Sequence, residues 1–222
     1  MLKTCLPKLV STSTGRGKIK VLKINTTITE PVRLDDDLLE EVNSLTYLGS
    51  VVDTQGGTDA DVRARIGKAR AVSLQLKNVW SSKDLTKVRI FNSNVKPVLL
   101  YGSETWRTTV ATTKKVQTFI NSCLRRILRI RWPITINNED LWQRTDQRPP
   151  DAEIMMRRWR WIGHTLRKPS TSITRQALSW DQRGKRKRGR PRNSGRWDLE
   201  ADIKRLGLTW SQLETKAQDR DS

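Results

Sequence analysis

The sequence predicts a mainly α-helical protein with a small β-hairpin near its N-terminus. Apolar and polar residues alternate before the Gly56-Gly57 pair, and this period of two is typical of strands. After the pair, apolar residues recur every three or four positions, which is typical of helices that bury one face. A strongly basic stretch precedes the last helical segments. The expected fold class is therefore mainly α, with a small N-terminal β-hairpin, a helical bundle, a basic linker and C-terminal helices.

The N-terminal part is expected to contain short strands. Residues 1–17 show no periodicity and contain several Ser, Thr and Gly residues, so we expect them to be disordered. Alternation predicts a strand over Ile19–Asn25 and a weaker one over Pro31–Leu34. The three aspartates at 35–37 should form a polar turn. A third strand is predicted over Leu45–Val52.

The first helix is expected just after the glycine pair, with Thr58 as its N-cap and Asp61 at the third helical position. It should extend to Trp80 and carry one apolar stripe, made by Val62, Ile66, Ala69, Val72, Leu76 and Val79. A second helix is predicted over residues 82–95. Pro97 should end it, because proline lacks the backbone amide that a continuing helix needs.

A buried apolar turn over residues 99–102 should lead to Trp106. The clearest helix follows, with one stripe made by Val116, Phe119, Ile120, Cys123, Ile127 and Ile130. Four further helices are predicted, over residues 138–144, 151–167, 197–207 and 211–220. The second of these four should bury Ile154, Trp161 and Leu166. Ser211 and Glu214 should cap the last one.

Charge is the most informative bulk property. The chain is +20, with 17 basic and 11 acidic residues up to position 110, and 26 basic and 12 acidic residues beyond it. Between Arg157 and Arg192 there are 13 Lys and Arg residues and one acid, Asp181. Like charges at this density repel one another, so we expect a polyanionic partner. RNA or DNA is the favoured partner, and a membrane surface is the weaker alternative.

Composition excludes several functional classes. No apolar run approaches the roughly 18 residues of a membrane span, and no signal-peptide core follows Met1. We therefore expect a nuclear or cytoplasmic protein that is not secreted. Cys5 and Cys123 fit a reducing compartment. Because His164 is the sole histidine, we expect no Cys/His zinc site, and no catalytic or metal-binding residue is predicted.

Seven blocks of sequence occur in an order that resembles a known family. They are Tyr47–Asp53, Gly56-Gly57 with Asp61–Ala69, Lys87–Asn92, Val98–Trp106, Arg158–His164, Gly184–Pro191 and Ala217–Arg220. The first four resemble the region just past the catalytic palm of LINE-type (non-LTR) retrotransposon reverse transcriptases. The others look like the C-terminal tail of the same element-encoded proteins. The likeness covers roughly residues 18–222, and residues 1–15 do not fit it.

The resemblance implies a role for the predicted hairpin and helices. Tyr47, Leu48 and Gly49 would belong to a hairpin that closes the palm and helps to hold the primer end. The helices after it would form a thumb that packs on the template–primer duplex. The thumb residues that contact the phosphate backbone of this duplex would be Lys68, Arg70, Lys77, Lys87 and Arg89. From the residues alone, a core strand ending in a turn and solvated helix faces remain open alternatives.

The same resemblance argues against catalysis by this chain alone. The family holds two Mg²⁺ ions with aspartates of a palm strand and of a Tyr-Xaa-Asp-Asp turn. That turn is missing from the sequence, and Asp35-Asp36-Asp37 fits a turn between strands better than a metal site. We expect no enzyme activity and no cofactor for the chain alone. The full-length polymerase would supply Mg²⁺ and the endonuclease. It would also supply the rest of the palm and the fingers, which are expected as partners of this part.

The basic linker, residues 170–192, is the strongest candidate nucleic-acid contact. Its core residues are Lys185, Arg186, Lys187, Arg188, Gly189, Arg190, Pro191 and Arg192. Residues 188–192 contain the Gly-Arg-Pro core of an AT-hook, whose arginines enter the minor groove of A·T-rich DNA. Nonspecific phosphate binding, nuclear import and a merely solvated linker remain open alternatives.

A second candidate contact lies in the helix expected over residues 149–169. Arg157, Arg158 and Arg160 could hold phosphates while Trp159 and Trp161 stack on bases. The alternative places Trp161 in the core and Trp159 against an arginine.

The predicted segments are residues 1–17, 18–56, 57–148, 149–169, 170–192 and 193–222. The favoured function is the C-terminal part of a retrotransposon endonuclease/reverse transcriptase that binds nucleic acid without catalysing polymerisation. A domesticated DNA-binding protein and a nonfunctional transposon remnant are the alternatives.

Overall fold

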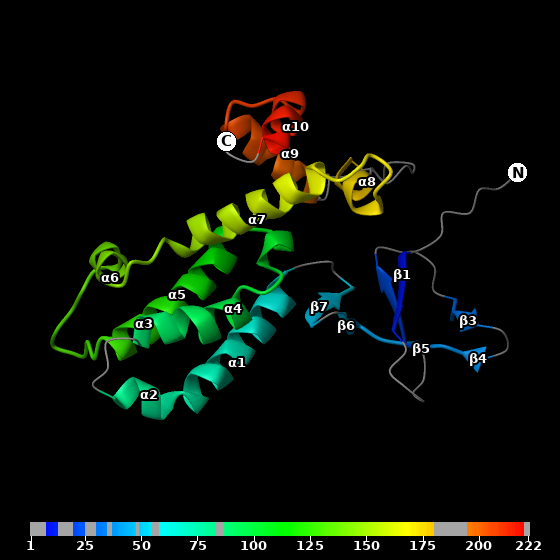
Figure 1. The fold of residues 1–222 in the computed structure, drawn as a ribbon. Coiled ribbons are helices and arrows are strands. Elements are labelled where there is room, and N and C mark those ends of the chain that lie inside the picture. Colours follow the sequence, from blue (N-terminus) through cyan, green and yellow to red (C-terminus); the bar gives the residue numbers. More distant parts are fainter. Residues whose placement is uncertain are drawn as a thin grey trace, which may run out of the picture. The chain divides into compact units, whose positions relative to one another are not determined.

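The computed structural model describes residues 8–12, 20–24, 30–34, 37–47, 49–54, 58–82, 87–179 and 195–219 (Figure 1). Strands come first along the chain and helices follow, so the predicted fold class is confirmed. The chain divides into two compact units, which are described separately. Unit 1 comprises residues 1–101 and 118–135, and unit 2 comprises residues 102–117 and 136–222.

The strands described in unit 1 form three small sheets. Antiparallel β1 (Lys8–Thr12) and β2 (Lys20–Ile24) pair along their whole length, and β5 (Glu40–Glu41) lies parallel to β2. The strand predicted over Ile19–Asn25 is thus confirmed as β2. The prediction of disorder over residues 1–17 is wrong for β1. Its apolar residues, Leu9 and Val10, are adjacent rather than alternating, so the pairing with β2 does not appear as local periodicity.

Two hairpins complete the strands. One joins β3 (Arg33–Leu34) to β4 (Asp37–Leu38), which confirms a strand in the weaker predicted segment. The other joins β6 (Ser44–Tyr47) to β7 (Ser50–Asp53), where one continuous strand had been predicted. Gly49 has a φ of 80° at its turn, a left-handed conformation that glycine adopts without steric cost. The apolar run over Leu45–Val52 is therefore a hairpin bent at Gly49, as the family resemblance implied, and not one strand.

The helices of unit 1 pack around a small apolar core. They are α1 (Asp59–Gln75), α2 (Lys77–Ser81), α3 (Lys87–Ile90), the π-helical turn η1 (Phe91–Val95), α4 (Lys96–Leu99) and the second half of α5 (Val110–Ile127). Buried apolar residues include Val62, Ala69, Phe91, Val95, Leu99, Leu100, Ile120 and Leu124. The capping box predicted at Thr58 is wrong, because the Thr58 side chain makes no capping hydrogen bond. The Asp61 carboxylate instead accepts a hydrogen bond from Val51 N at 2.9 Å.

Pro97 does not end the helical segment as predicted. It lies in the first turn of α4, directly after η1, and helical structure continues to Leu99. A proline is tolerated in a first turn because amides there need no partner within the helix. The wider π turn before α4 interrupts the α-helical hydrogen-bond pattern at this point. Pro97 therefore marks a junction inside one helical stretch.

The apolar stripe predicted for α5 is confirmed for Val116, Phe119, Ile120, Cys123 and Ile127, which are all buried. Burial raises the pKa of the Cys123 thiol, and the Ser73 hydroxyl lies 3.9 Å from its sulfur. Cys123 is therefore a packing residue in its thiol form.

Unit 2 is built around α7 (Pro150–Leu166). It also contains the 3₁₀ turn η2 (Ser103–Thr105), the first half of α5, and the helices α6 (Asn138–Arg144), α8 (Ile173–Ser179), α9 (Gly195–Arg205) and α10 (Trp210–Gln218). Helices α9 and α10 lie against the C-terminal part of α7 (Figure 1), and their shared core contains Ile162, Leu166, Leu199, Ile203, Leu213 and Ala217. Helix α6 has the predicted bounds. Helix α8 falls within the segment predicted as an extended linker.

Two sequence expectations for unit 2 are wrong. Trp161 is 38 % exposed, whereas Trp159 packs against the core of α7, α9 and α10. Trp159 lies three residues before Ile162 on α7, so both point toward the same face. The capping box of α10 is formed by Thr209 and Gln212, and it begins the helix earlier than the predicted cap.

No helix within the described ranges combines the length and apolar character needed to cross a bilayer.

Candidate nucleic-acid interface

Helix α1 holds the β6–β7 hairpin through polar side chains on one of its faces. Asp61 Oδ1 accepts a hydrogen bond from Val51 N at 2.9 Å, and Lys68 Nζ donates to the Gly49 carbonyl at 3.2 Å. Positions 61, 65 and 68 lie about one turn apart on an α-helix and share a face. Figure 1 shows the hairpin beside the N-terminal end of α1. The hairpin turn is thus attached to the helix that follows it in sequence.

Arg65 is the central residue of this attachment, and the sequence analysis did not identify it. Its guanidinium donates to Ser50 Oγ at 3.1 Å, lies 3.7 Å from Asp61 Oδ1, and stacks 4.5 Å from the centre of the Tyr101 ring. The residue is 5 % exposed. The spacing of Asp61 and Arg65 was an available signal, because oppositely charged residues four apart on a helix face each other.

We expect Arg65→Lys to destabilise unit 1 by about 1–2 kcal/mol, because lysine keeps the charge but loses the planar fork that bonds and stacks here. Arg63→Lys is the matched control, since Arg63 is exposed on the same helix and should change stability by less than about 0.5 kcal/mol. Urea unfolding of both variants measures the difference. Equal midpoints would show that Arg65 does not hold the hairpin.

Two of the three predicted primer-contact residues, Tyr47 and Gly49, lie at the turn of this hairpin. Tyr47 is 51 % exposed at the end of β6, and Gly49 lies in the turn. Leu48 lies outside the described residues. The exposure of Tyr47 excludes the alternative that it is a core residue, and it leaves the phenol ring accessible.

The predicted helix contacts are exposed, with one exception. Lys68, Arg70 and Lys77 are exposed on α1 and α2, and Arg89 is exposed on α3. Lys87 is 8 % exposed, and its ammonium group donates to the Ser82 carbonyl. Lys87 is therefore a structural residue, and the expectation that it contacts a duplex backbone is wrong.

The predicted arginines of α7 have three different environments. Arg160 is exposed, and Arg157 is paired with Glu153 at 3.4 Å one turn away. Arg158 is 7 % exposed, and its guanidinium donates to Asp202 Oδ2 at 3.0 Å and to the Trp106 carbonyl. The expectation that Arg158 contacts nucleic acid is therefore wrong. It lies four residues after Ile154 and four before Ile162, which places it on the buried face of α7.

The basic core of the tail lies outside the described residues. This applies to Lys185, Arg186, Lys187, Arg188, Gly189, Arg190, Pro191 and Arg192. Its role remains a prediction from charge and sequence.

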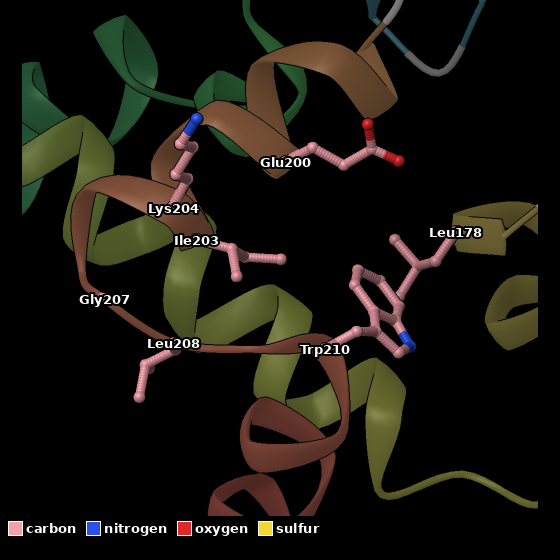
Figure 2. Close-up of a pocket in the computed structure, with 7 residues that line it drawn as sticks. All are labelled: Leu178, Glu200, Ile203, Lys204, Gly207, Leu208 and Trp210. Atoms are coloured by element: carbon pink, nitrogen blue, oxygen red, sulfur yellow. The ribbon is translucent and has the colours of Figure 1, made fainter.

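A groove of about 500 Å³ lies between α8, α9 and α10 (Figure 2). Its apolar wall is formed by Leu178, Ile203 and Trp210, and Figure 2 shows the indole beside the Leu178 side chain. Glu200 and Lys204 add one negative and one positive charge at its edge, so the groove has no net preference for an anion. No sequence signal had indicated this groove.

Within the described ranges, no group of three or more His, Cys, Asp or Glu side chains is arranged to hold a metal ion. His164 is exposed on α7.

Comparison with known proteins gives one short family match and one longer likeness. Residues 74–101 match a domain of unknown function, DUF6451. The chain is 26 % identical over 191 residues to a Caenorhabditis elegans protein described as uncharacterized and transposon-derived. The alignment covers 83 % of this chain and 63 % of that protein, so the chain spans less than two thirds of the relative's length. No solved structure matches the chain significantly. The chain is thus similar, along most of its length, to a transposon-derived protein.

Proposed function

We propose that this chain is the C-terminal part of a LINE-type retrotransposon reverse transcriptase, comprising the end of the palm, the thumb and a basic tail. In this role it binds template and primer strands through helix α1 and the tail. The likeness to a transposon-derived protein and the ordered sequence blocks support this origin. The chain contributes phosphate contacts, whereas Mg²⁺ and the remaining palm and fingers belong to the complete polymerase.

One structural observation carries the proposal. The hairpin turn at Gly49 is held by Asp61, Arg65 and Lys68 on one face of α1, and the exposed phenol of Tyr47 lies beside that turn. A hairpin fixed to the first helix of a helical body is what a primer-holding element joined to a thumb requires. Basic residues exposed on the same helix supply charge of the sign that a phosphate backbone attracts.

The test replaces Lys68, Arg70 and Lys77 with Gln and measures binding of a primed RNA template by fluorescence anisotropy. If all three contact phosphates, the slope of log K against log salt should fall by roughly 2–3 in magnitude. The matched control replaces exposed Arg144, Lys204 and Lys216 of unit 2 with Gln, which removes the same charge. Equal slopes for the two triple variants would contradict a role for α1.

A second candidate function rests on residues 188–192. Their Gly-Arg-Pro core favours a domesticated DNA-binding protein that inserts arginines into narrow A·T-rich minor grooves. The same basic run would serve as a nuclear import signal, which gives a nuclear location in either case. This candidate requires A·T-rich duplex to outcompete both G·C-rich duplex and RNA–DNA hybrid.

A further inference from the structure

The end of α5 is shaped to direct the chain into a tight turn. Ile130 N donates to the Arg125 carbonyl at 2.9 Å, and Arg129 N donates to the Arg126 carbonyl at 3.1 Å. This is the pattern of a Schellman motif, in which the residue after the helix adopts a left-handed conformation. Arg129 has a φ of 57° at that position, where glycine is usual.

Arg129 also anchors the start of the turn. Its guanidinium donates to the Ser81 carbonyl at 2.6 Å and to the Ser82 carbonyl at 3.2 Å, at the end of α2. These bonds use a side chain that glycine would lack, and they tie the segment after α5 to the rest of unit 1. The backbone that leads into residues 131–134 is therefore held in place at Arg129.

The next four residues form an exposed aromatic tip, which we name the Trp132 turn (residues 131–134). Ile134 N donates to the Arg131 carbonyl at 2.9 Å, which closes a four-residue turn with Trp132 and Pro133 at its centre. Trp132 is 90 % exposed and Ile134 is 68 % exposed. An indole presented in this way leaves both ring faces available to a partner, and the closed turn limits the entropy lost on binding.

The charge around the turn indicates what kind of partner it meets. The unit 1 segment over residues 118–135 contains Arg125, Arg126, Arg129 and Arg131 and no acidic residue. An exposed aromatic ring on a segment rich in cations is suited to single strands, because bases can stack on the ring while the cations attract the phosphates. Inside a duplex the bases stack on one another, so a duplex offers the ring a free base face only at its ends.

We propose that the Trp132 turn is a base-stacking site for single-stranded nucleic acid. This site rests on the proposed nucleic-acid-binding function. It adds to that function a preference for single strands and a stacking residue, Trp132, in a turn that was not among the predicted contacts. In a polymerase, such a site would hold a template strand that is not yet paired.

The test measures binding of a mixed-sequence 12-nucleotide single strand by fluorescence anisotropy, and a closed circular duplex, which has no terminal base pairs, is used as the competitor that reports duplex affinity. Trp132→Ala should weaken single-strand binding by roughly 5- to 100-fold without changing its salt slope, because stacking involves no counterion. Duplex affinity should stay within about twofold, and Trp132→Phe should restore most of the single-strand affinity. Ile173→Ala is the control, since Ile173 is apolar and 82 % exposed in unit 2.

Three results would overturn the inference. In the first, Trp132→Ala leaves single-strand affinity unchanged while replacement of Arg188, Arg190 and Arg192 with Ala weakens binding. This result would contradict the stacking site and agree with the proposed function. Loss of single-strand and duplex affinity together would show a general structural effect. A concentration-dependent self-association of the wild type that Trp132→Ala abolishes, with unchanged single-strand affinity, would identify the turn as a protein contact. If the wild-type chain binds neither the single strand nor the duplex, the proposed binding function itself fails.

Discussion

The affinity of this chain for nucleic acid should fall by roughly 10³- to 10⁵-fold between 50 and 200 mM salt, as expected for about 6–10 phosphate contacts. The 13 basic residues between Arg157 and Arg192 supply enough charge for that number, even without the buried Arg158. Each phosphate neutralised by a cation releases bound counterions, so added salt opposes binding. Titrations of one duplex at several salt concentrations give the slope of log K against log salt.

The tail should account for much of this slope. Replacing Arg188, Arg190 and Arg192 with Ala removes three positive charges and should lower the slope by roughly 2–3 in magnitude. The triple variant of Arg144, Lys204 and Lys216 serves again as a control of equal charge. A salt-independent affinity in the wild type would remove the electrostatic argument, and an unchanged slope in the tail variant would assign the contacts to other parts of the chain.

The largest effect on stability is expected for Arg158→Met, which should destabilise unit 2 by about 3–5 kcal/mol. The substitution removes the 3.0 Å partner of the Asp202 carboxylate, whose side chain is 12 % exposed, and leaves it the longer ion pair with the exposed Arg205 at 3.6 Å. It also removes one hydrogen bond to the Trp106 carbonyl. A buried charge or carbonyl that loses its partner keeps the full cost of its desolvation.

Urea unfolding of Arg158→Met measures this effect. The matched control is Arg160→Met on the exposed face of α7, which should change stability by less than about 0.5 kcal/mol. In Arg158→Met/Asp202→Leu, both charged partners are replaced by apolar groups, so much of the loss should be recovered. Equal destabilisation by the two single variants would contradict a structural role for Arg158. A wild type without a cooperative transition would favour a nonfunctional remnant.

Local sequence patterns predicted the helices well. Helix α6 has the predicted bounds, and the stripe of α5 is buried as expected, because both follow from spacing within a few turns. Strand β1 was missed because its apolar residues, Leu9 and Val10, are adjacent and show no alternation, so only its pairing with β2 identifies it as a strand. The helical stretch continues past Pro97 because a π turn precedes it, and this turn has no sequence signal that we recognise.

The candidate interface could be predicted less completely. The sequence does not distinguish an exposed Lys or Arg that binds phosphate from one that is only solvated. Lys87, which is buried, shows that assigning a lysine to the surface can also be wrong. The exchange of Trp159 and Trp161 between core and surface depends on where α9 and α10 pack against α7. Arg65 was missed because its hydroxyl partner, Ser50, lies in a strand 15 residues earlier. Arg158 lies four residues from both Ile154 and Ile162, and this spacing could have predicted that its side chain lies on the buried face of α7.

The most direct test of the proposed function is a competition measurement on the full chain. A labelled primed RNA template would be displaced in turn by an RNA–DNA hybrid, an A·T-rich DNA duplex and a G·C-rich DNA duplex of equal length. The proposal predicts that the hybrid competes at least as well as either DNA duplex and that the two DNA duplexes are equivalent. Preferential displacement by the A·T-rich duplex would contradict the proposal and identify a minor-groove DNA-binding protein.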